Sequence, residues 1–293
     1  MLSILIPVYN YDLAPLVKAL SVQIESLEQE VELLIRDDGS TILEHGNSEL
    51  NNLSWVRYFK NDKNLGRSAT RQTLAQDASY QQLLFLDADV LPAKEDFLNQ
   101  YISHEALKTS IGCGGVSYQD QPPAKEQMLR YVFGQRRERQ PASVRQKSPY
   151  MVLAANLWIK KELFLSLNDQ LENFYGDDLV LSQKIRTQAL EVVHLDNSVI
   201  HLGLESSEVF LNKTDQMIAN LVRLEKAGIL DTDLMRLQRA YLDLKSKGLC
   251  KPFLWATKQL LPGMRRNLLG AKPSMKTFDA YKLHHYTKLK THG

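Results

Sequence analysis

Short apolar runs alternate with helical patterns over the first two thirds of the chain. The runs LSILIPV, VELLIRD, WVRYF, QLLFLDADV and IGCGGVSY predict strands over residues 2–8, 31–37, 55–59, 82–90 and 111–118. Between the earlier runs, apolar positions recur with helical spacing at about 13–28 and 67–78. Strands that alternate with helices predict an α/β fold with a mostly parallel central sheet that helices cover on both faces.

The second half of the chain continues this pattern with a larger share of helix. Residues 124–138 predict a helix, MVLAANLWIKKELF at 151–164 a strand that runs into a short helix, and NFYGDDLVLSQKI at 173–185 a turn into a helix with acidic first residues. Residues 206–246 predict two helices separated near Gly228. The Arg-rich segment 136–147 has the composition of a mobile, irregular loop or of plain solvated surface.

Polar side chains follow three of the predicted strands at the points where those strands end. They are Tyr9 and Asn10 after the first strand, Asp37 and Asp38 after the second, and Asp87 and Asp89 after the fourth. Ligands of open α/β sheets bind beyond the carboxyl ends of the strands. We therefore expect these three strand ends to converge on one site.

Asp87 and Asp89 directly follow four apolar residues of a predicted buried strand. In an extended chain, positions i and i+2 project to the same side, so both carboxylates can face one object. Two converging carboxylates repel each other unless a cation joins them. The Asp-x-Asp pattern therefore indicates Mg²⁺ or Mn²⁺ bound through oxygen, usually together with a phosphate. A polar turn before a helix cap is the alternative.

Composition limits the classes of protein to which this chain can belong. Its 293 residues, 44% of them hydrophobic, are enough to bury a large core. No apolar stretch reaches the roughly 18 to 20 residues that cross a bilayer, and the start MLSILIPVYN lacks the features of a signal peptide. We therefore expect a cytoplasmic protein. Its two cysteines, Cys113 and Cys250, predict neither a disulfide framework nor a zinc site.

The net charge of +2 hides a basic C-terminal tail. Residues 251–293 carry nine Lys or Arg and one acid, Asp279, a net charge of +8, which leaves −6 for the rest of the chain. Apolar residues interleave with these cations, so the tail fits peripheral contact with the anionic inner face of a cell membrane. A helix packed on the body of the protein is the alternative. Nucleic acid is not an expected partner, because no basic face with interleaved aromatics is evident in the main domain.

Taken together, several motifs are more specific than any one of them. In chain order they are SILIPVYN, IRDDGST, NDKNLGRSATRQTLA, FLDADV, AANLWIKKELF and YGDDLVLSQKI. This series resembles the signature of family 2 glycosyltransferases of the GT-A fold, over about residues 1–205. The resemblance implies transfer of a sugar from a nucleotide diphosphate sugar with inversion at the anomeric carbon, aided by a divalent metal and without a covalent intermediate.

The resemblance also assigns roles to individual residues. It implies that Pro7, Tyr9 and Asp38 line the nucleobase pocket, that Arg71 reaches the base or the phosphates, that Asp87 and Asp89 form the Asp-x-Asp motif, that Asp178 is the base, and that His201 lies near the metal and the diphosphate. We expect Asp89 and His201 to hold Mn²⁺ or Mg²⁺, and Asp87 to contribute to nucleotide binding. Asp177 is the rival of Asp178 for the role of base, with capping of the following helix as its other role.

Elementary chemistry supports several of these roles independently. An aspartate such as Asp38 can accept an N–H from the edge of a nucleobase while Tyr9 stacks on its π face. A metal held by Asp89 would stabilise the charge that grows on the leaving diphosphate, and Arg71 could assist. Asp37, by contrast, could serve only the turn in DDGS.

The resemblance predicts a GT-A domain at residues 1–205, with a nucleotide-sugar half at about 1–110 and an acceptor half at about 111–205, and a helical extension with a basic tail at 206–293. The chain departs from the family at Val180, where many relatives carry a second acid or charged group, and it lacks a QxxRW motif. A processive, membrane-embedded polysaccharide synthase is therefore not expected.

Three functions stay open on the sequence. The first is transfer from a UDP-sugar to a hydroxyl of a surface glycan or of a lipid-linked acceptor. The second is nucleotidyl transfer, although IPVYNYDLAP offers no glycine- and lysine-rich phosphate loop. The third is a nucleotide-sugar binding protein without turnover.

Overall fold

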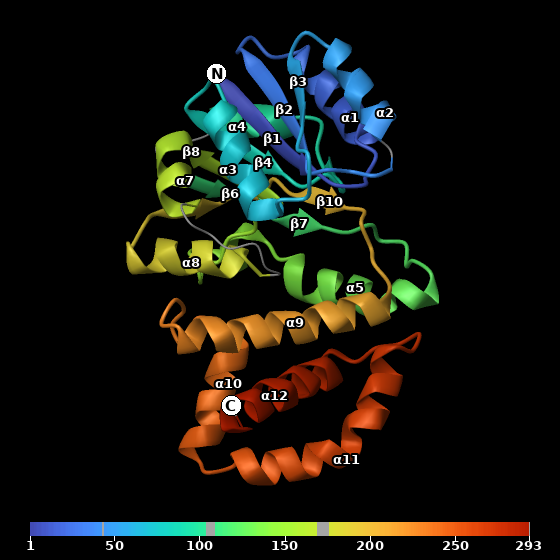
Figure 1. The fold of residues 1–293 in the computed structure, drawn as a ribbon, viewed down its shortest axis with the longest axis vertical. Coiled ribbons are helices and arrows are strands. Elements are labelled where there is room, and N and C mark those ends of the chain that lie inside the picture. Colours follow the sequence, from blue (N-terminus) through green and yellow to red (C-terminus); the bar gives the residue numbers. More distant parts are fainter. Residues whose placement is uncertain (43, 104–108, 169–175, 293) are drawn as a thin grey trace. The chain divides into compact units, whose positions relative to one another are not determined.

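The computed structural model describes residues 1–42, 44–103, 109–168 and 176–292 (Figure 1). The chain forms two compact units. The first comprises Met1–Gln119 and Glu138–Gly203, and the second comprises Asp120–Arg137 and Leu204–Gly293. The division near residue 204 lies close to the boundary expected at 205. The grouping of residues 120–137 with the C-terminal helices differs from the continuous domains that we predicted.

The first unit contains a seven-stranded sheet in the order β3-β2-β1-β4-β8-β6-β9. Its strands are β1 (Leu2–Val8), β2 (Val31–Asp37), β3 (Val56–Lys60), β4 (Gln82–Leu86), β6 (Ile111–Cys113), β8 (Asn156–Lys160) and β9 (Val192–His194). Strand β1 pairs in parallel with both β2 and β4, with Ile4 beside Leu33 and beside Leu84. Only β8 runs antiparallel to its neighbours, β4 and β6. The mostly parallel sheet is therefore confirmed.

Helices flank this sheet on both faces. They are α1 (Ala14–Ile24), α3 (Arg67–Asp77), α4 (Phe97–Ser103), α7 (Lys161–Asn168) and α8 (Asp178–Thr187), with the short α2 (Glu44–Ser48), η1 (Glu49–Asn52) and α6 (Ala142–Arg145). Leu5, Phe85 and Leu157 of the sheet join Leu74 of α3 and Phe164 of α7 in one buried cluster. Helices α1 and α4 pack against each other outside that cluster. The helix predicted at 13–28 ends at Ile24, and that at 67–78 ends at Asp77.

A second, three-stranded sheet has the order β5-β10-β7 and consists of β5 (Val90–Pro92), β7 (Val116–Ser117) and β10 (Val199–His201). The predictions of single strands at 82–90 and 111–118 are therefore wrong, because each run contributes one strand to each sheet. The second run breaks at Gly114 and Gly115. Gly115 has a φ of +82°, and a Cβ on Gly114 would overlap with Tyr101 and Asn156.

The Arg-rich segment 136–147 is not an irregular loop. It contains the end of a π-helical turn, η4 (Gly134–Glu138), and the helix α6. Arg145 fastens α6 to the sheet, because its guanidinium donates to the carbonyl oxygens of Cys113 at 2.9 Å and Leu195 at 2.6 Å. Its Nε also donates to Gln140 O at 3.0 Å. Composition alone did not reveal that one of these arginines supports the fold.

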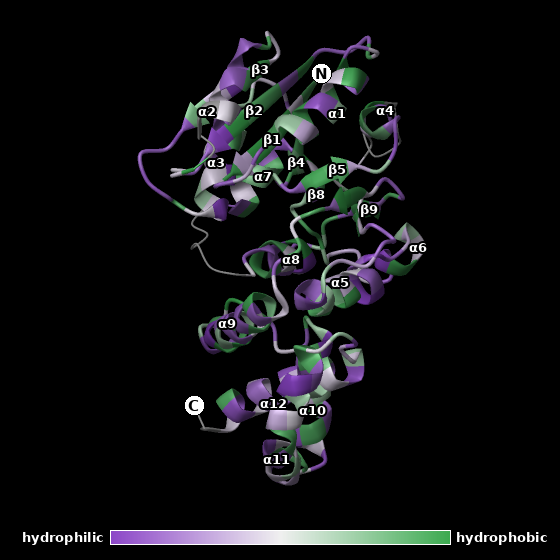
Figure 2. Ribbon diagram, turned by 90° about the vertical axis from the view of Figure 1, so that its right-hand side faces the viewer, coloured by the Kyte–Doolittle hydropathy of each residue, from purple (hydrophilic) through white to green (hydrophobic). Residues whose placement is uncertain are grey.

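The second unit is helical. Its elements are η3 (Lys125–Gln127), α5 (Met128–Phe133), α9 (Ser207–Lys226), α10 (Arg236–Ser246), α11 (Cys250–Leu268) and α12 (Met275–His292). The two helices predicted within 206–246 are confirmed, and Gly228 between them has a φ of +70°. The helix predicted at 124–138 is instead divided into η3, α5 and η4. In Figure 2, α9 shows both hydrophilic and hydrophobic stretches, as a helix with one buried face should.

The basic tail forms two helices that help to build the core of this unit. Leu268, Met275, Phe278 and Tyr281 from the tail are buried together with Phe210 of α9, Leu211 and Leu129. Of the two alternatives for the tail, the structure favours packing on the rest of the protein for its buried apolar residues. Among the described residues, no helix is both long and apolar enough to cross a membrane.

Candidate functional site

The predicted site residues come from the carboxyl ends of β1, β2 and β4, from α3, from the start of α8 and from the end of β10. Pro7 is a buried residue of β1 and pairs in register with Arg36 of β2. Tyr9, directly after β1, is 49% exposed, so its ring is free to stack on a flat ligand. Asn10 has a φ of 51°, and its side-chain oxygen accepts from Thr41 N at 2.9 Å. The turn after β1 is thereby tied to the chain after β2.

The two aspartates that end β2 both serve the local structure. Asp37 is fully buried and accepts from Tyr58 Oη and from Ser40 N, each at 2.7 Å. The role of Asp37 in the turn is therefore confirmed. The carboxylate of Asp38 accepts from Leu65 N and Gly66 N, each at 2.8 Å.

Asp38 thus holds the loop that leads into α3, and Asn61 Nδ2 also donates to it at 2.9 Å. Close packing of this loop explains the glycine in DDGS. A Cβ on Gly39 would lie 2.8 Å from the carbonyl carbon of Lys63, and its φ is +80°. A nucleobase contact by Asp38 stays a prediction and would have to use the lone pairs that these three bonds leave free.

Arg71 of α3 lies among three of the predicted carboxylates. Its Nη2 donates to Asp87 Oδ1 at 2.7 Å, and its Nη1 is 3.7 Å from Asp177 Oδ2 and 3.8 Å from Asp178 Oδ1. The Arg71 side chain is only 4% exposed. Its Nε is buried and has no hydrogen-bond partner in the described part of the chain. Arg71 therefore links the Asp-x-Asp segment to the start of α8.

The two aspartates at the start of α8 differ in environment. Asp177 is buried and accepts from Ser68 Oγ at 2.6 Å, and its side chain makes no capping hydrogen bond to α8. Asp178 is the more accessible of the two, with a side chain 31% exposed against 7% for Asp177. Burial, followed by the neighbouring charge of Asp177, raises the pKa of Asp178 to about 6, while Arg71 and Arg67 oppose the rise.

Asp89 and His201 meet although they are far apart in sequence. His201 Nε2 lies 3.2 Å from Asp89 Oδ2. The antiparallel pairing of β10 with β5 brings them together, since His201 stands opposite Val90. Leu202 N donates to Asp89 O at 2.8 Å. A Cβ on Gly203 would overlap with the Asp89 carboxylate, so glycine is needed there.

The donors of this pair fit a divalent ion that finishes its coordination with ligand oxygens. A carboxylate oxygen and an imidazole nitrogen are both suitable ligands for Mn²⁺. Over the described ranges, no group of three or more His, Cys, Asp or Glu side chains could enclose a metal ion. Mg²⁺ and Mn²⁺ sites in nucleotide enzymes commonly use one or two protein ligands together with phosphate oxygens and water. The geometry thus suits a metal bound jointly by the protein and a diphosphate.

Two aromatic residues near this pair were not predicted. The ring of Tyr118 lies 5.6 Å from that of His201. Burial, followed by the charges of Asp89 and Asp12, raises the pKa of Tyr11. Tyr11 follows Tyr9 and Asn10, so its position after β1 was a usable signal. Tyr118 offered none, because the run 111–118 that contains it was predicted as a single strand.

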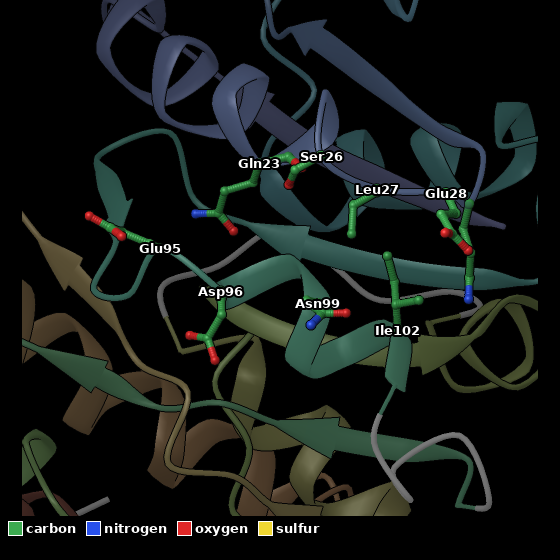
Figure 3. A pocket seen from close by; sticks show the side chains of 9 residues that line it. Gln23, Ser26, Leu27, Glu28, Glu95, Asp96, Asn99 and Ile102 are labelled. Atoms are coloured by element: carbon green, nitrogen blue, oxygen red, sulfur yellow. The ribbon is translucent and has the colours of Figure 1, made fainter.

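A groove elsewhere in the first unit does not coincide with the predicted site. Figure 3 shows it between the end of α1 and α4, with Gln23, Leu27, Asp96 and Asn99 among its lining side chains. It encloses about 520 Å³ and borders the chain that enters β2. None of the predicted site residues lines it.

Comparison with known proteins gives a consistent result. The sequence matches the model of Glycosyl transferase family 2 over residues 3–164, more than half of the chain. No curated protein matches the chain by sequence. The fold is similar to that of the mannosyltransferase PcManGT from Pyrobaculum calidifontis, solved in complex with GDP-Man and Mn²⁺, with a TM-score of 0.60, 16% identity, and coverage of 98% of this chain and 86% of that one.

A second similar fold is that of S. aureus TarS 1–349 in complex with UDP-GlcNAc, with a TM-score of 0.53 and 15% identity over 99% of this chain and 92% of that one. At such identities the likeness shows the fold alone, and it agrees with the mixed sheet and the flanking helices described above. The match over residues 3–164 contains β1, the Asp-x-Asp segment and β8. The chain therefore belongs to glycosyltransferase family 2 and has the GT-A fold.

Proposed function

We propose that this chain transfers a sugar from a nucleotide diphosphate sugar, in the first instance a UDP-sugar, to an acceptor hydroxyl with inversion at the anomeric carbon. The observation that carries the proposal is the position of Arg71 between Asp87 of the Asp-x-Asp motif and the Asp177–Asp178 pair. The donor-binding motif and the candidate base thereby share one cationic link. An inverting transferase needs both ends of the reaction within one sugar's reach.

At the donor end, Asp89 and His201 would hold Mn²⁺ or Mg²⁺. The ion supplies positive charge next to the diphosphate, whose negative charge grows as the glycosidic bond breaks. The half-exposed ring of Tyr9 would stack on the base, with Pro7 beneath it in β1. The nucleotide sugars bound to PcManGT and TarS support this class of donor. Because one is GDP-Man and the other UDP-GlcNAc, both UDP- and GDP-sugars should be tested.

At the acceptor end, Asp178 is the proposed general base. A base removes the proton of the attacking hydroxyl on the face opposite the leaving diphosphate. The pKa of about 6 leaves Asp178 ionised at neutral pH while making it a stronger base than an ordinary aspartate. Asp177 is less suited, because it is buried and already accepts from Ser68.

The structure supports a changed role for Arg71. Its guanidinium is almost fully buried and directed at carboxylates, so it does not present a free face to a nucleotide. We propose that Arg71 is a positioning residue that fixes Asp87 and offsets the charge of Asp177 and Asp178. Direct contact of Arg71 with the base or the phosphates would require Asp87 to release it.

The proposal extends to the acceptor and to the cellular setting. A hydroxyl of a surface glycan, free or lipid-linked, is the proposed acceptor, and the cytoplasmic side of the cell membrane is the proposed setting. Support comes from the family and from the basic helices of the second unit. The loops at 115–150 and 170–180 are the expected determinants of specificity, and residues 169–175 lie outside the described part of the chain.

The test is donor hydrolysis, since transferase sites release some donor to water. The protein is incubated with a panel of UDP- and GDP-sugars and Mn²⁺, and release of the nucleoside diphosphate is followed with and without EDTA. Slow, metal-dependent release from one donor supports the proposal. Release of pyrophosphate from a nucleoside triphosphate would favour nucleotidyl transfer instead. Tight donor binding without any release, also in the presence of glycan acceptors, would favour a binding protein.

A further inference from the structure

Helix α11 carries an outward face with an exposed tryptophan at its centre. Trp255 is 76% exposed. At helical spacing, Lys251 and Lys258 flank it at i−4 and i+3. Pro262 lies inside α11, which is bent in Figure 1, and Arg266 follows this proline along the chain. All of these residues are exposed. We call these five residues the α11 face.

The opposite side of α11 is held by its own unit. Thr257 and Leu268 are buried, and Thr257 Oγ1 lies 2.6 Å from His284 Nδ1 of α12. The unit therefore fixes the rotation of α11 about its axis. The tryptophan cannot turn inward without breaking this packing, so its exposure is a property of the folded unit.

The charge around Trp255 has a single sign. Residues 250–278 contain six Lys or Arg and no Asp or Glu. Arg265 pairs with Glu208 at 2.7 Å. No ion pair is recorded for Lys251, Lys258 or Arg266 with any residue that the structure describes. The α11 face thus carries two lysines next to one large amphipathic ring and Arg266 further along the helix, with no acid of α11 to oppose them.

This combination matches the chemistry of an anionic lipid surface. Tryptophan favours the boundary between lipid and water, where its indole lies against acyl chains and its N–H stays in a polar layer. Lysine and arginine next to it are attracted by the negative surface potential of phosphatidylglycerol or phosphatidylserine. A helix that lies flat on the surface needs this arrangement of an apolar centre and a basic border.

Other occupants fit the α11 face less well. In a symmetric dimer through this face, the three cations of one copy would face those of the other, which costs free energy. A single-stranded nucleic acid is bound by several aromatics along a basic groove, whereas this face offers one. Charge complementarity therefore favours a lipid surface.

We propose that the α11 face docks the protein on an anionic membrane, with the part of α11 around Trp255 parallel to the bilayer. This goes beyond the proposed reaction and does not depend on it. It also narrows the proposed region of membrane contact from the whole tail to five residues. Other cations of the tail belong to the fold of the unit, since Lys282 pairs with Asp279 at 3.1 Å and Lys290 with Glu225 at 2.7 Å.

The test uses the full chain and vesicles of phosphatidylcholine with and without 30–40% phosphatidylglycerol, a range of about one anionic lipid in three. We expect co-sedimentation with the anionic vesicles only, reduced by raising NaCl from about 0.1 to 0.5 M. Charge reversal of Lys251, Lys258 and Arg266 to Glu should weaken binding by about 100-fold or more. The same reversal at the exposed Lys18, Lys147 and Lys160 of the first unit is the matched control and should retain most of the binding.

Fluorescence gives a second measurement that does not depend on charge. A Trp55→Phe background leaves Trp158, which is 1% exposed, and Trp255. Brominated anionic lipids should quench the tryptophan fluorescence of this variant, and the additional Trp255→Phe substitution should abolish the quenching. Equal loss of binding in both charge-reversal variants, binding to neutral vesicles, or no binding to vesicles would overturn the proposal. So would a dimer in solution that Trp255→Ala converts to monomer, or capture of anionic polymers without vesicle binding. Donor hydrolysis in the same samples shows independently whether the proposed reaction holds.

Discussion

The Nη2 atom of Arg71 donates to Asp87 Oδ1 at 2.7 Å, and this bond ties the Asp-x-Asp segment to α3. The other end of the guanidinium lies within 4 Å of Asp177 and Asp178. Three carboxylates therefore lie around one buried cation.

The first prediction concerns the removal of that cation. Arg71→Met should lower the free energy of unfolding by about 3–5 kcal/mol, because it leaves carboxylates that are partly buried without their counter-charge. It should also raise the pKa of Asp178 further. Arg71→Lys keeps the charge but loses the planar fork, so it should restore part of the stability. Urea denaturation at pH 7 measures both variants.

The positioning role is separated from a merely structural one by the pH–rate profile. The acidic limb of kcat/KM should move to higher pH in Arg71→Met and by a smaller amount in Arg71→Lys. An unchanged limb in a folded Arg71→Met protein would show that Arg71 does not control the base.

The second prediction concerns the base itself. Asp178→Asn should lower turnover by roughly 100-fold to 10,000-fold, the usual effect of a lost general base. Metal-dependent UDP binding should stay nearly intact, since Asp89 and His201 are untouched. Steady-state rates and calorimetry on the same preparation provide the two measurements.

Asp177→Asn is the matched control for this prediction. It removes the neighbouring negative charge that raises the pKa of Asp178, so the acidic limb of kcat/KM should shift from near 6 to lower pH. Near-normal turnover in Asp178→Asn together with an inactive Asp177→Asn would make Asp177 the base.

The third prediction concerns stability and pH. The folded pKa of Asp178, about 6, lies above its ordinary 3.8, so the folded protein disfavours the charged form. The contribution of this group to stability is then full below about pH 4 and is lost as the pH rises through 6. Asp178→Asn should therefore stabilise the protein at pH 7 by about 1–3 kcal/mol.

The same comparison at pH 4 provides the control, because there the wild-type carboxyl is mostly protonated and the difference should nearly vanish. Thermal melts of wild type and Asp178→Asn at both values of pH are sufficient. A variant that is less stable than wild type at pH 7 would show that the ionised Asp178 is favourably paired.

The fourth prediction concerns the metal. Asp89→Asn should weaken UDP affinity in Mn²⁺ by about one to two orders of magnitude, as expected for a lost charged contact. Gly203→Ala should act in the same direction without touching a ligand, because its Cβ would displace the Asp89 carboxylate.

Gly263→Ala is the control for the added methyl group, since a Cβ there meets nothing within 4 Å. Calorimetric titration of UDP with Mn²⁺ and with EDTA compares the three variants. Unchanged affinity in Asp89→Asn would remove this residue from the metal site. Unchanged affinity in Gly203→Ala alone would show that Asp89 tolerates the shift.

The elements that the sequence predicted best are those determined by local pattern. The bounds of β1 and β2 agree with the predicted runs because β1 is almost continuously apolar, β2 has an apolar centre, and both are buried in a parallel sheet. The division of 82–90 and 111–118 between two sheets was missed. Each break depends on tertiary contacts, such as the close approach of Asn156 and Tyr101 to Gly114.

In the candidate site too, local sequence pattern was predictive and tertiary contacts were not predicted. Strand ends indicated Asp87 and Asp89, because the edge of a parallel sheet gathers polar groups. The bond from Arg71 to Asp87 joins two elements through side chains, and helical spacing within α3 contains no information about it. The tail shows the same limit, since its cations gave a charge but not the burial of Phe278. Deletion of residues 251–293 would therefore remove core residues, and point substitutions on α11 are the better probe.

Because the pairing of β10 with β5 brings His201 to Asp89, metal affinity should depend on how often these two strands separate. The two strands share only three register pairs, from Val199 with Pro92 to His201 with Val90, so they can separate without unfolding the large sheet. Each such opening would part His201 from Asp89 and leave half a site. A bound ion and diphosphate would hold the strands together. Amide hydrogen exchange at β10 would then slow by a factor that rises with the ligand concentration divided by its Kd. Binding of the donor would thus control how often β10 separates from β5.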